Sequence, residues 1–192
     1  MTFPVLPSSQ KPLPRKHHKT IRDRWLDAEY VAAHAEITLR NTVHFADSLP
    51  VAWPNLGPEV FSAFYGCEME YGEETAWSKP ILSDWSAESL GELQLNRDCV
   101  YFRKLVEITE ALIERGRGKF IVGYTDLHGG GDALAAFRDP QELLVDTIEN
   151  PDAIKRLCER ITRDFLEVYD FFHVMLSDAG MPSTTWLPAT CK

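Results

Sequence analysis

The chain has 192 residues, enough for one domain with a substantial core, and its 44% hydrophobic and 26% charged residues are ordinary globular values. Its formal net charge of −9 argues against a general nucleic-acid binder, which needs a basic face for phosphate. The sequence has no run of 18 apolar residues, and its four cysteines are widely spaced without a CxxC pair. We therefore expect a cytoplasmic protein with reduced thiols and with neither nucleic-acid nor membrane partners.

The first 19 residues are expected to form a flexible leader, because they contain four prolines and no apolar periodicity. The basic end of this leader, residues 15–19, is either a solvated charge run or a contact for a phosphate or carboxylate. A helix over 20–42 follows, with Thr20 as its N-cap and apolar residues recurring at helical spacing. A short strand candidate then ends in polar groups that include Asp47, and Trp53 lies in the proline-rich loop that follows.

Strand candidates alternate with helices along the rest of the chain. Strands are predicted at about 42–46, 69–77, 119–123 and 184–187, and helices over 58–65, 96–115, 139–147 and 150–180. This alternation is typical of an α/β fold with parallel strands and crossover helices. A closed eight-stranded barrel takes about 250 residues, so a chain that ends in a strand candidate is interpreted as the front part of something larger.

The richest stretch of the sequence is residues 118–137, GKFIVGYTDLHGGGDALAAF. It predicts a short apolar strand, a polar glycine loop and then a helix. Such a unit builds ligand sites at the carboxyl ends of strands. Tyr124, Asp126 and His128 are candidates for binding a substrate or moving a proton. Gly129 and Gly130 either let a ligand approach the backbone closely or simply form a flexible turn.

Several segments together resemble the uroporphyrinogen decarboxylase superfamily. They are the run from residue 118 to residue 161, which contains RDPQELLVD and NPDAI, the WPNLGPE segment at 53–59, FYG at 64–66 and ETAW at 74–77. The resemblance covers roughly residues 20–192 and implies a TIM barrel. Together with the strand and helix pattern, it leads us to expect a partial TIM barrel, truncated before closure, over residues 20–192 after the leader at 1–19.

The resemblance implies two chemistries. The decarboxylases remove acetate carboxyls from a tetrapyrrole without a cofactor, whereas related methyltransferases use zinc and a corrinoid. In the decarboxylases an aspartate in a Phe-Ser-Asp-Ile-Leu context contacts the pyrrole N–H groups, and Phe45-Ala-Asp47-Ser-Leu49 is the nearest match here. The alternative for Asp47 is that it caps the following turn. The arginine motif with which the decarboxylases bind substrate carboxylates has no counterpart in this chain.

We therefore expect a decarboxylase-like enzyme that takes a small-molecule substrate without a cofactor. The alternatives are a methyltransferase that would use zinc or corrinoid, and a fragment that acts only after assembly with another chain. A homodimer is one such assembly. No metal ligands are assigned. The expected catalytic residues are Asp47, Tyr124, Asp126 and His128, and the expected substrate-binding residues are Trp53, Gly129, Gly130 and Trp186.

Overall fold

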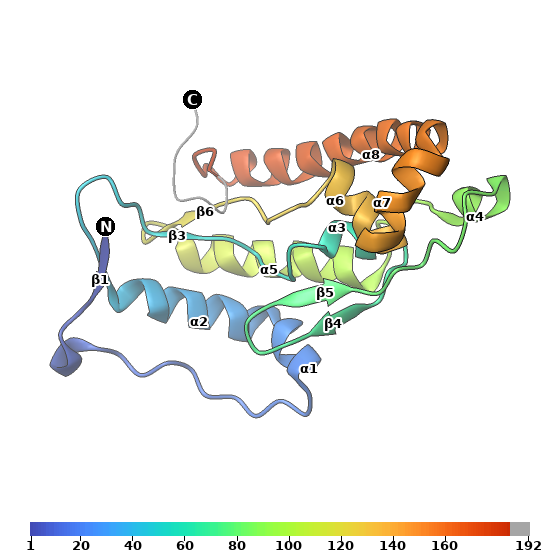
Figure 1. Ribbon diagram of the computed structural model, residues 1–192. Helices are drawn as coiled ribbons and strands as arrows, with labels where there is room; N and C mark the ends of the chain where they lie inside the picture. Colours follow the sequence, from blue (N-terminus) through green and yellow to red (C-terminus); the bar gives the residue numbers. More distant parts are fainter. Residues whose placement is uncertain (185–192) are drawn as a thin grey trace. The chain divides into compact units, whose positions relative to one another are not determined.

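The computed structural model describes residues 1–184 (Figure 1). Its helices are α1 (Ile21–Trp25), α2 (Ala28–Arg40), α3 (Val60–Ala63), α4 (Ala87–Glu92), α5 (Val100–Gly116), α6 (Gly130–Arg138), α7 (Pro140–Glu149) and α8 (Pro151–Asp178), with a 3₁₀ turn at Pro7–Ser9. Its strands are β1 (Thr2–Pro4), β2 (Thr42–His44), β3 (Val51–Ala52), β4 (Met69–Tyr71), β5 (Ala76–Ser78) and β6 (Ile121–Val122).

The expected partial TIM barrel is wrong. The chain is 52% helical, and its described strands form separate sheets of two strands each. Two of these sheets are antiparallel, β1 with β2 and β4 with β5, and the parallel pairing that a barrel needs is confined to β3 and β6. The strand candidates at 42–46 and 69–77 thus became parts of antiparallel ribbons, because a local apolar pattern does not encode which partner a strand pairs with.

The chain divides into two compact units. The first contains residues 1–55, 104–126 and the part from Phe171 onward, and the second contains 56–103 and 127–170. The division falls inside α5 and α8, so each of these helices contributes residues to both units.

In the first unit, α2 contacts β2 and β3 and is tied to α5 by ion pairs. Glu36 accepts hydrogen bonds from Arg115 at 3.0 Å and from Lys119 at 2.6 Å. The bond from Lys119 is the main reason that the pKa of Glu36 is lowered, and it outweighs the opposing effect of burial. Buried Leu105, Ile108 and Leu112 give α5 the apolar face that the sequence predicted.

The leader is hydrogen-bonded along α2, and Figure 1 shows it following this helix from β1 to α1. The backbone of Lys11 exchanges two hydrogen bonds of 2.8 Å with the side chain of Asn41. Lys16 and His18 then pair with Asp27, the N-cap of α2. Burial alone would raise the pKa of Asp27, but hydrogen bonds from Lys16, from His18 and from the α2 backbone lower it to about 2. The basic end of the leader therefore meets a carboxylate of its own chain.

In the second unit, a cluster of aromatic rings forms the core. Phe61, Phe64 and Phe137 are fully buried, and Tyr65 packs edge-on against both Phe61 and Phe137. The Tyr65 hydroxyl donates a 2.7 Å hydrogen bond to Asp164. Burial and this bond raise the pKa of Tyr65, so the pair is a buried structural contact rather than a proton source near neutral pH.

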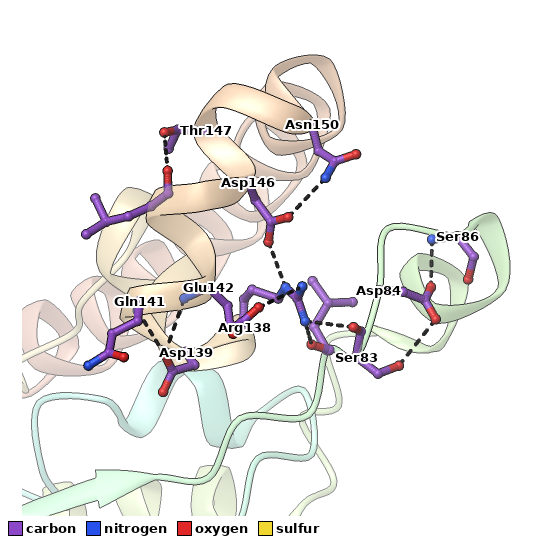
Figure 2. Close-up of polar contacts among 12 residues, drawn as sticks. Ser83, Asp84, Ser86, Arg138, Asp139, Gln141, Glu142, Asp146, Thr147 and Asn150 are labelled. Carbon is purple, nitrogen blue, oxygen red and sulfur yellow. Dashed lines mark hydrogen bonds and ion pairs between the residues drawn. The ribbon is translucent and has the colours of Figure 1, made fainter.

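Arg138, at the end of α6, clamps α7 to the segment that follows β5 (Figure 2). Its Nε donates to Asp146 at 2.7 Å, and its Nη1 donates to the Ser83 carbonyl at 2.7 Å and to the Leu82 carbonyl at 3.3 Å. Burial alone would raise the pKa of Asp146, yet hydrogen bonds, above all from Arg138, hold it below its usual value. Between the two helices stands Asp139, whose φ is +87° and whose carboxylate caps α7.

Candidate functional site

The parallel pair β3–β6 brings two segments of polar residues to one edge. The Ile121 amide donates to the Pro50 carbonyl at 2.9 Å, and the Gly123 amide donates to the Ala52 carbonyl at 2.8 Å. On the other side of β6, the Tyr124 amide donates to the Thr184 carbonyl at 3.0 Å. Because β3 and β6 run in the same direction, the residues that follow them leave from the same edge, where open α/β sheets bind ligands.

We call the residues that follow these two strands the polar edge. They are Trp53 and Asn55 after β3, and Tyr124, Thr125 and Asp126 after β6. Trp53, Asn55 and Asp126 are half-buried, whereas Tyr124 and Thr125 are buried. This set offers an aromatic wall, an amide, two hydroxyls and a carboxylate, which suffice to orient a polar small molecule.

Tyr124 and Thr125 are the buried members of the polar edge. The Tyr124 ring lies parallel to the imidazole of His173 on α8, with 6.2 Å between ring centroids and 5° between planes. The phenol and imidazole can each donate or accept a proton. The Thr125 hydroxyl is buried without a hydrogen-bond partner among the described residues, so a bound ligand or water would satisfy it.

Asp47 lies apart from the polar edge along the strand direction. It follows Ala46, which has a φ of +54°, in an exposed turn four residues before β3 begins. Asp126 lies four residues after β6 ends. The parallel register therefore puts Asp47 on the amino side of the pair and Asp126 on the carboxyl side.

His128, Gly129 and Gly130 belong to the second unit. The imidazole of His128 lies 4.0 Å from the exposed carboxylate of Asp132, at the limit of an ion pair. A Cβ on Gly129 would come within 2.8 Å of the Phe165 ring, so close packing against α8 requires this glycine. Gly130 has a φ of +57° where α6 begins. Packing explains the glycine at 129, and the positive φ explains the glycine at 130, without a ligand. Trp186, the remaining expected substrate-binding residue, lies outside the described residues.

The sequence missed three members of the site. Asn55, Thr125 and His173 are not among the expected site residues. An asparagine in a proline loop, a threonine between titratable residues and a histidine within a long helix give no specific signal. In the structure His173 is exposed on α8. Only the pairing of β3 with β6, together with the stacking on Tyr124, identifies this set.

No group of three His, Cys, Asp or Glu side chains that could hold a metal ion occurs within residues 1–184. Over the same part of the chain, every helix is too short or too polar to cross a bilayer. The Cys67 thiol is buried, and burial raises its pKa to about 12, so it is a core residue and not a nucleophile.

Comparisons of the chain with protein-family models, with curated proteins and with solved structures find no match. The site is therefore characterised by its own geometry.

Proposed function

We propose that the chain is a lyase of the uroporphyrinogen decarboxylase type, which removes a carboxyl group from a tetrapyrrole or a related carboxylated substrate. The resemblance of its sequence motifs to that superfamily suggests the reaction. The observation that carries the proposal is the polar edge, where Asp126, Tyr124 and Thr125 follow one parallel strand and Trp53 and Asn55 follow its partner. We propose further that the enzyme acts in the cytoplasm on a small-molecule substrate without a cofactor.

The chemistry needs a group that stabilises positive charge on the substrate ring. Protonation of a pyrrole carbon makes a cation. The bond to the carboxylate carbon then breaks, its electron pair enters the ring, and CO₂ leaves. The exocyclic methylene carbon takes up a proton to become a methyl group, and the ring carbon releases the proton it had gained, which restores the pyrrole. A carboxylate that accepts the pyrrole N–H bonds stabilises that cation more strongly than the neutral ground state. Asp126 can fill this role, and the Tyr124 phenol can orient the substrate or carry a proton.

The resemblance gives the pyrrole-binding role to Asp47, whereas the geometry favours Asp126. Asp47 is in an exposed turn on the amino side of β3, while Asp126 is half-buried and directly follows Tyr124 and Thr125 on the carboxyl side of β6. Half-buried carboxylates act on a ligand more strongly than solvated ones, because less water screens them. Asp126 is thus the preferred candidate and Asp47 the alternative.

The test compares the isosteric variants Asp126→Asn, Asp47→Asn and Asp178→Asn in one assay. Uroporphyrinogen is incubated with the protein under anaerobic conditions, and the products are oxidised and separated by their number of carboxyl groups. Asp126→Asn should lower kcat by about 100-fold, because it removes the charge that stabilises the cation. Asp178→Asn is the matched control, since Asp178 is exposed at the end of α8 in the same unit, and it should leave the rate unchanged.

Each other outcome decides against part of the proposal. If Asp47→Asn loses activity while Asp126→Asn keeps it, the reaction stands and the polar edge is not its site. If the wild-type chain releases no CO₂ from uroporphyrinogen or its partly decarboxylated forms, the proposed reaction is wrong. A stoichiometric zinc content, measured by metal analysis, would favour the methyltransferase instead.

A further inference from the structure

One face of the ribbon formed by β1 and β2 is apolar and exposed. Phe3 and Val43 are cross-strand partners, and Met1 and Phe45 lie two residues away along their strands, so all four side chains share a face. The Phe45 amide donates to the Met1 carbonyl at 3.1 Å, which extends the ribbon to this pair. Phe3 is 49% exposed and Phe45 is 64% exposed. We call these four residues the ribbon face.

The leader carries two further exposed apolar side chains. Leu6 and Leu13 are both exposed, and they lie on the part of the chain that runs from β1 along α2. A phenylalanine offers about 150–250 Å² of surface, so the two half-exposed rings alone present about 200 Å². With Met1 and Val43 the apolar area of the ribbon face reaches several hundred Å², the size of the largest patch on a typical monomer, which is often a functional one.

Two cations, Lys11 and Arg40, lie beside the start of the ribbon. Residues 1–19 contain four Lys and Arg residues and no acidic residue, although the whole chain has a net charge of −9. Lys16 is paired with Asp27, but Lys11, Arg15 and Arg40 form no ion pair with any described residue. Lys11 is bonded to Asn41, which directly follows Arg40, so both cations lie where the ribbon begins.

We propose that the ribbon face and the leader bind the surface of an anionic lipid bilayer. The aromatic and aliphatic side chains would enter the boundary between head groups and acyl chains, while Lys11 and Arg40 meet the phosphates. This peripheral contact needs no spanning helix. The sequence led us to expect no membrane partner, because the apolar face exists only through the pairing of β1 with β2, which the sequence does not reveal. The proposal is independent of the decarboxylase reaction.

Charge favours a lipid surface over a second copy of this chain. Two identical ribbon faces packed together would bring Lys11 and Arg40 of one copy toward the same residues of the other, and like charges oppose that contact. The one acidic residue that closely follows the ribbon is Asp47, which offsets only part of the charge. The cations that oppose self-association are those that an anionic bilayer attracts.

A second exposed apolar surface provides a matched control. Leu144 and Ile148 lie one turn apart on α7 and are 70% and 83% exposed. Acidic Glu142 and Glu149 are on the same helix, so this surface lacks the cations of the ribbon and leader. If apolar exposure alone caused vesicle binding, α7 would contribute as much as the ribbon face.

The experiment is co-sedimentation of the full chain with vesicles of phosphatidylcholine alone or mixed three to one with phosphatidylglycerol. We expect binding to the anionic vesicles only, and weaker binding at higher salt. Phe3→Ser combined with Phe45→Ser should weaken binding by at least about tenfold, because each exposed ring contributes about 100 Å² of apolar contact. Lys11→Glu combined with Arg40→Glu should weaken it by at least about tenfold as well. Leu144→Ser combined with Ile148→Ser should change nothing.

Three results would overturn the proposal. The first is a wild-type chain that does not bind anionic vesicles. The second is a loss of binding in the α7 control equal to the loss in the ribbon variants. The third is a wild-type dimer in size-exclusion chromatography that Phe3→Ser and Phe45→Ser convert to a monomer, which would identify a second copy as the occupant. Far-UV circular dichroism verifies that each variant is folded. If the variant with Phe3→Ser and Phe45→Ser unfolds, the variant with Lys11→Glu and Arg40→Glu, whose changes are at exposed positions, still tests the proposal.

Discussion

Replacing Asp146 by alanine is expected to destabilise the second unit by about 3 kcal/mol. Asp146 is 4% exposed and accepts hydrogen bonds from Arg138 at 2.7 Å and from Asn150 at 3.0 Å. Its removal leaves the Arg138 guanidinium, with a side chain only 16% exposed, without its closest counter-charge. Breaking a buried ion pair from one side costs about 3–5 kcal/mol, and the carbonyls of Leu82 and Ser83 still bind Arg138, so we expect the lower value.

The assay is urea unfolding followed by circular dichroism, with Glu142→Ala as the control. Glu142 pairs with the same arginine, but at 3.5 Å and with a side chain 63% exposed, so its loss should cost no more than about 0.5 kcal/mol. An Asp146→Ala variant that is no less stable than Glu142→Ala would refute the role assigned to burial in this clamp.

The same clamp predicts a pH dependence with a definite sign. The pKa of Asp146 is lowered in the folded protein, so its stabilising contribution is complete above the unfolded pKa of about 3.9 and is lost as the pH falls through the folded value. The difference in unfolding free energy between wild type and Asp146→Asn should therefore stay constant from pH 7 to about pH 5 and shrink below about pH 4. A difference that is unchanged at acid pH would contradict the ion pair as its source.

Three further predictions concern single positions. Gly57→Ala should cost more than Gly66→Ala in urea unfolding, although both have positive φ, because a Cβ at Gly57 would come within 2.7 Å of the Ala76 Cβ while one at Gly66 meets nothing within 4 Å. Thr20→Ala should lower the free energy of unfolding by about 1 kcal/mol, since it removes the side chain that caps α1. Cys67 should resist iodoacetamide at pH 8 until the protein is unfolded, because its pKa is raised to about 12; mass spectrometry of the alkylated peptides measures this.

Features of the fold that depend on near neighbours in the sequence were predictable. The helix predicted over 150–180 is α8 at Pro151–Asp178, the helix predicted over 139–147 is α7 at Pro140–Glu149, and Thr20 caps a helix as expected. These signals are local, because a cap bonds to an amide two or three residues away and a proline acts on its own turn. The helix predicted over 20–42 is broken into α1 and α2 because Asp27 caps a new helix inside it.

Features that depend on distant partners were not predictable. The leader at residues 1–19 pairs with β2 through β1, and its Lys16 and His18 bind Asp27. Nothing in residues 1–19 alone indicates those partners, which lie on later elements. The same reason explains the barrel error, since an apolar run of three residues predicts a strand but not the direction of its neighbour.

The assignment of Asp47 shows why the candidate site needed the structure. A match of five residues around Asp47 indicates a side chain of the right type, but it does not encode the side of β3 on which that side chain lies. The parallel register of β3 and β6 separates the amino side, with Asp47, from the carboxyl side, with Asp126. Their separation along the strand direction amounts to up to nine residues, at most about 30 Å if fully extended. Because the two carboxylates leave opposite ends of the strand pair, we expect a ring bound at the polar edge to contact Asp126 and not Asp47, so the two isosteric asparagine variants should not show equal losses.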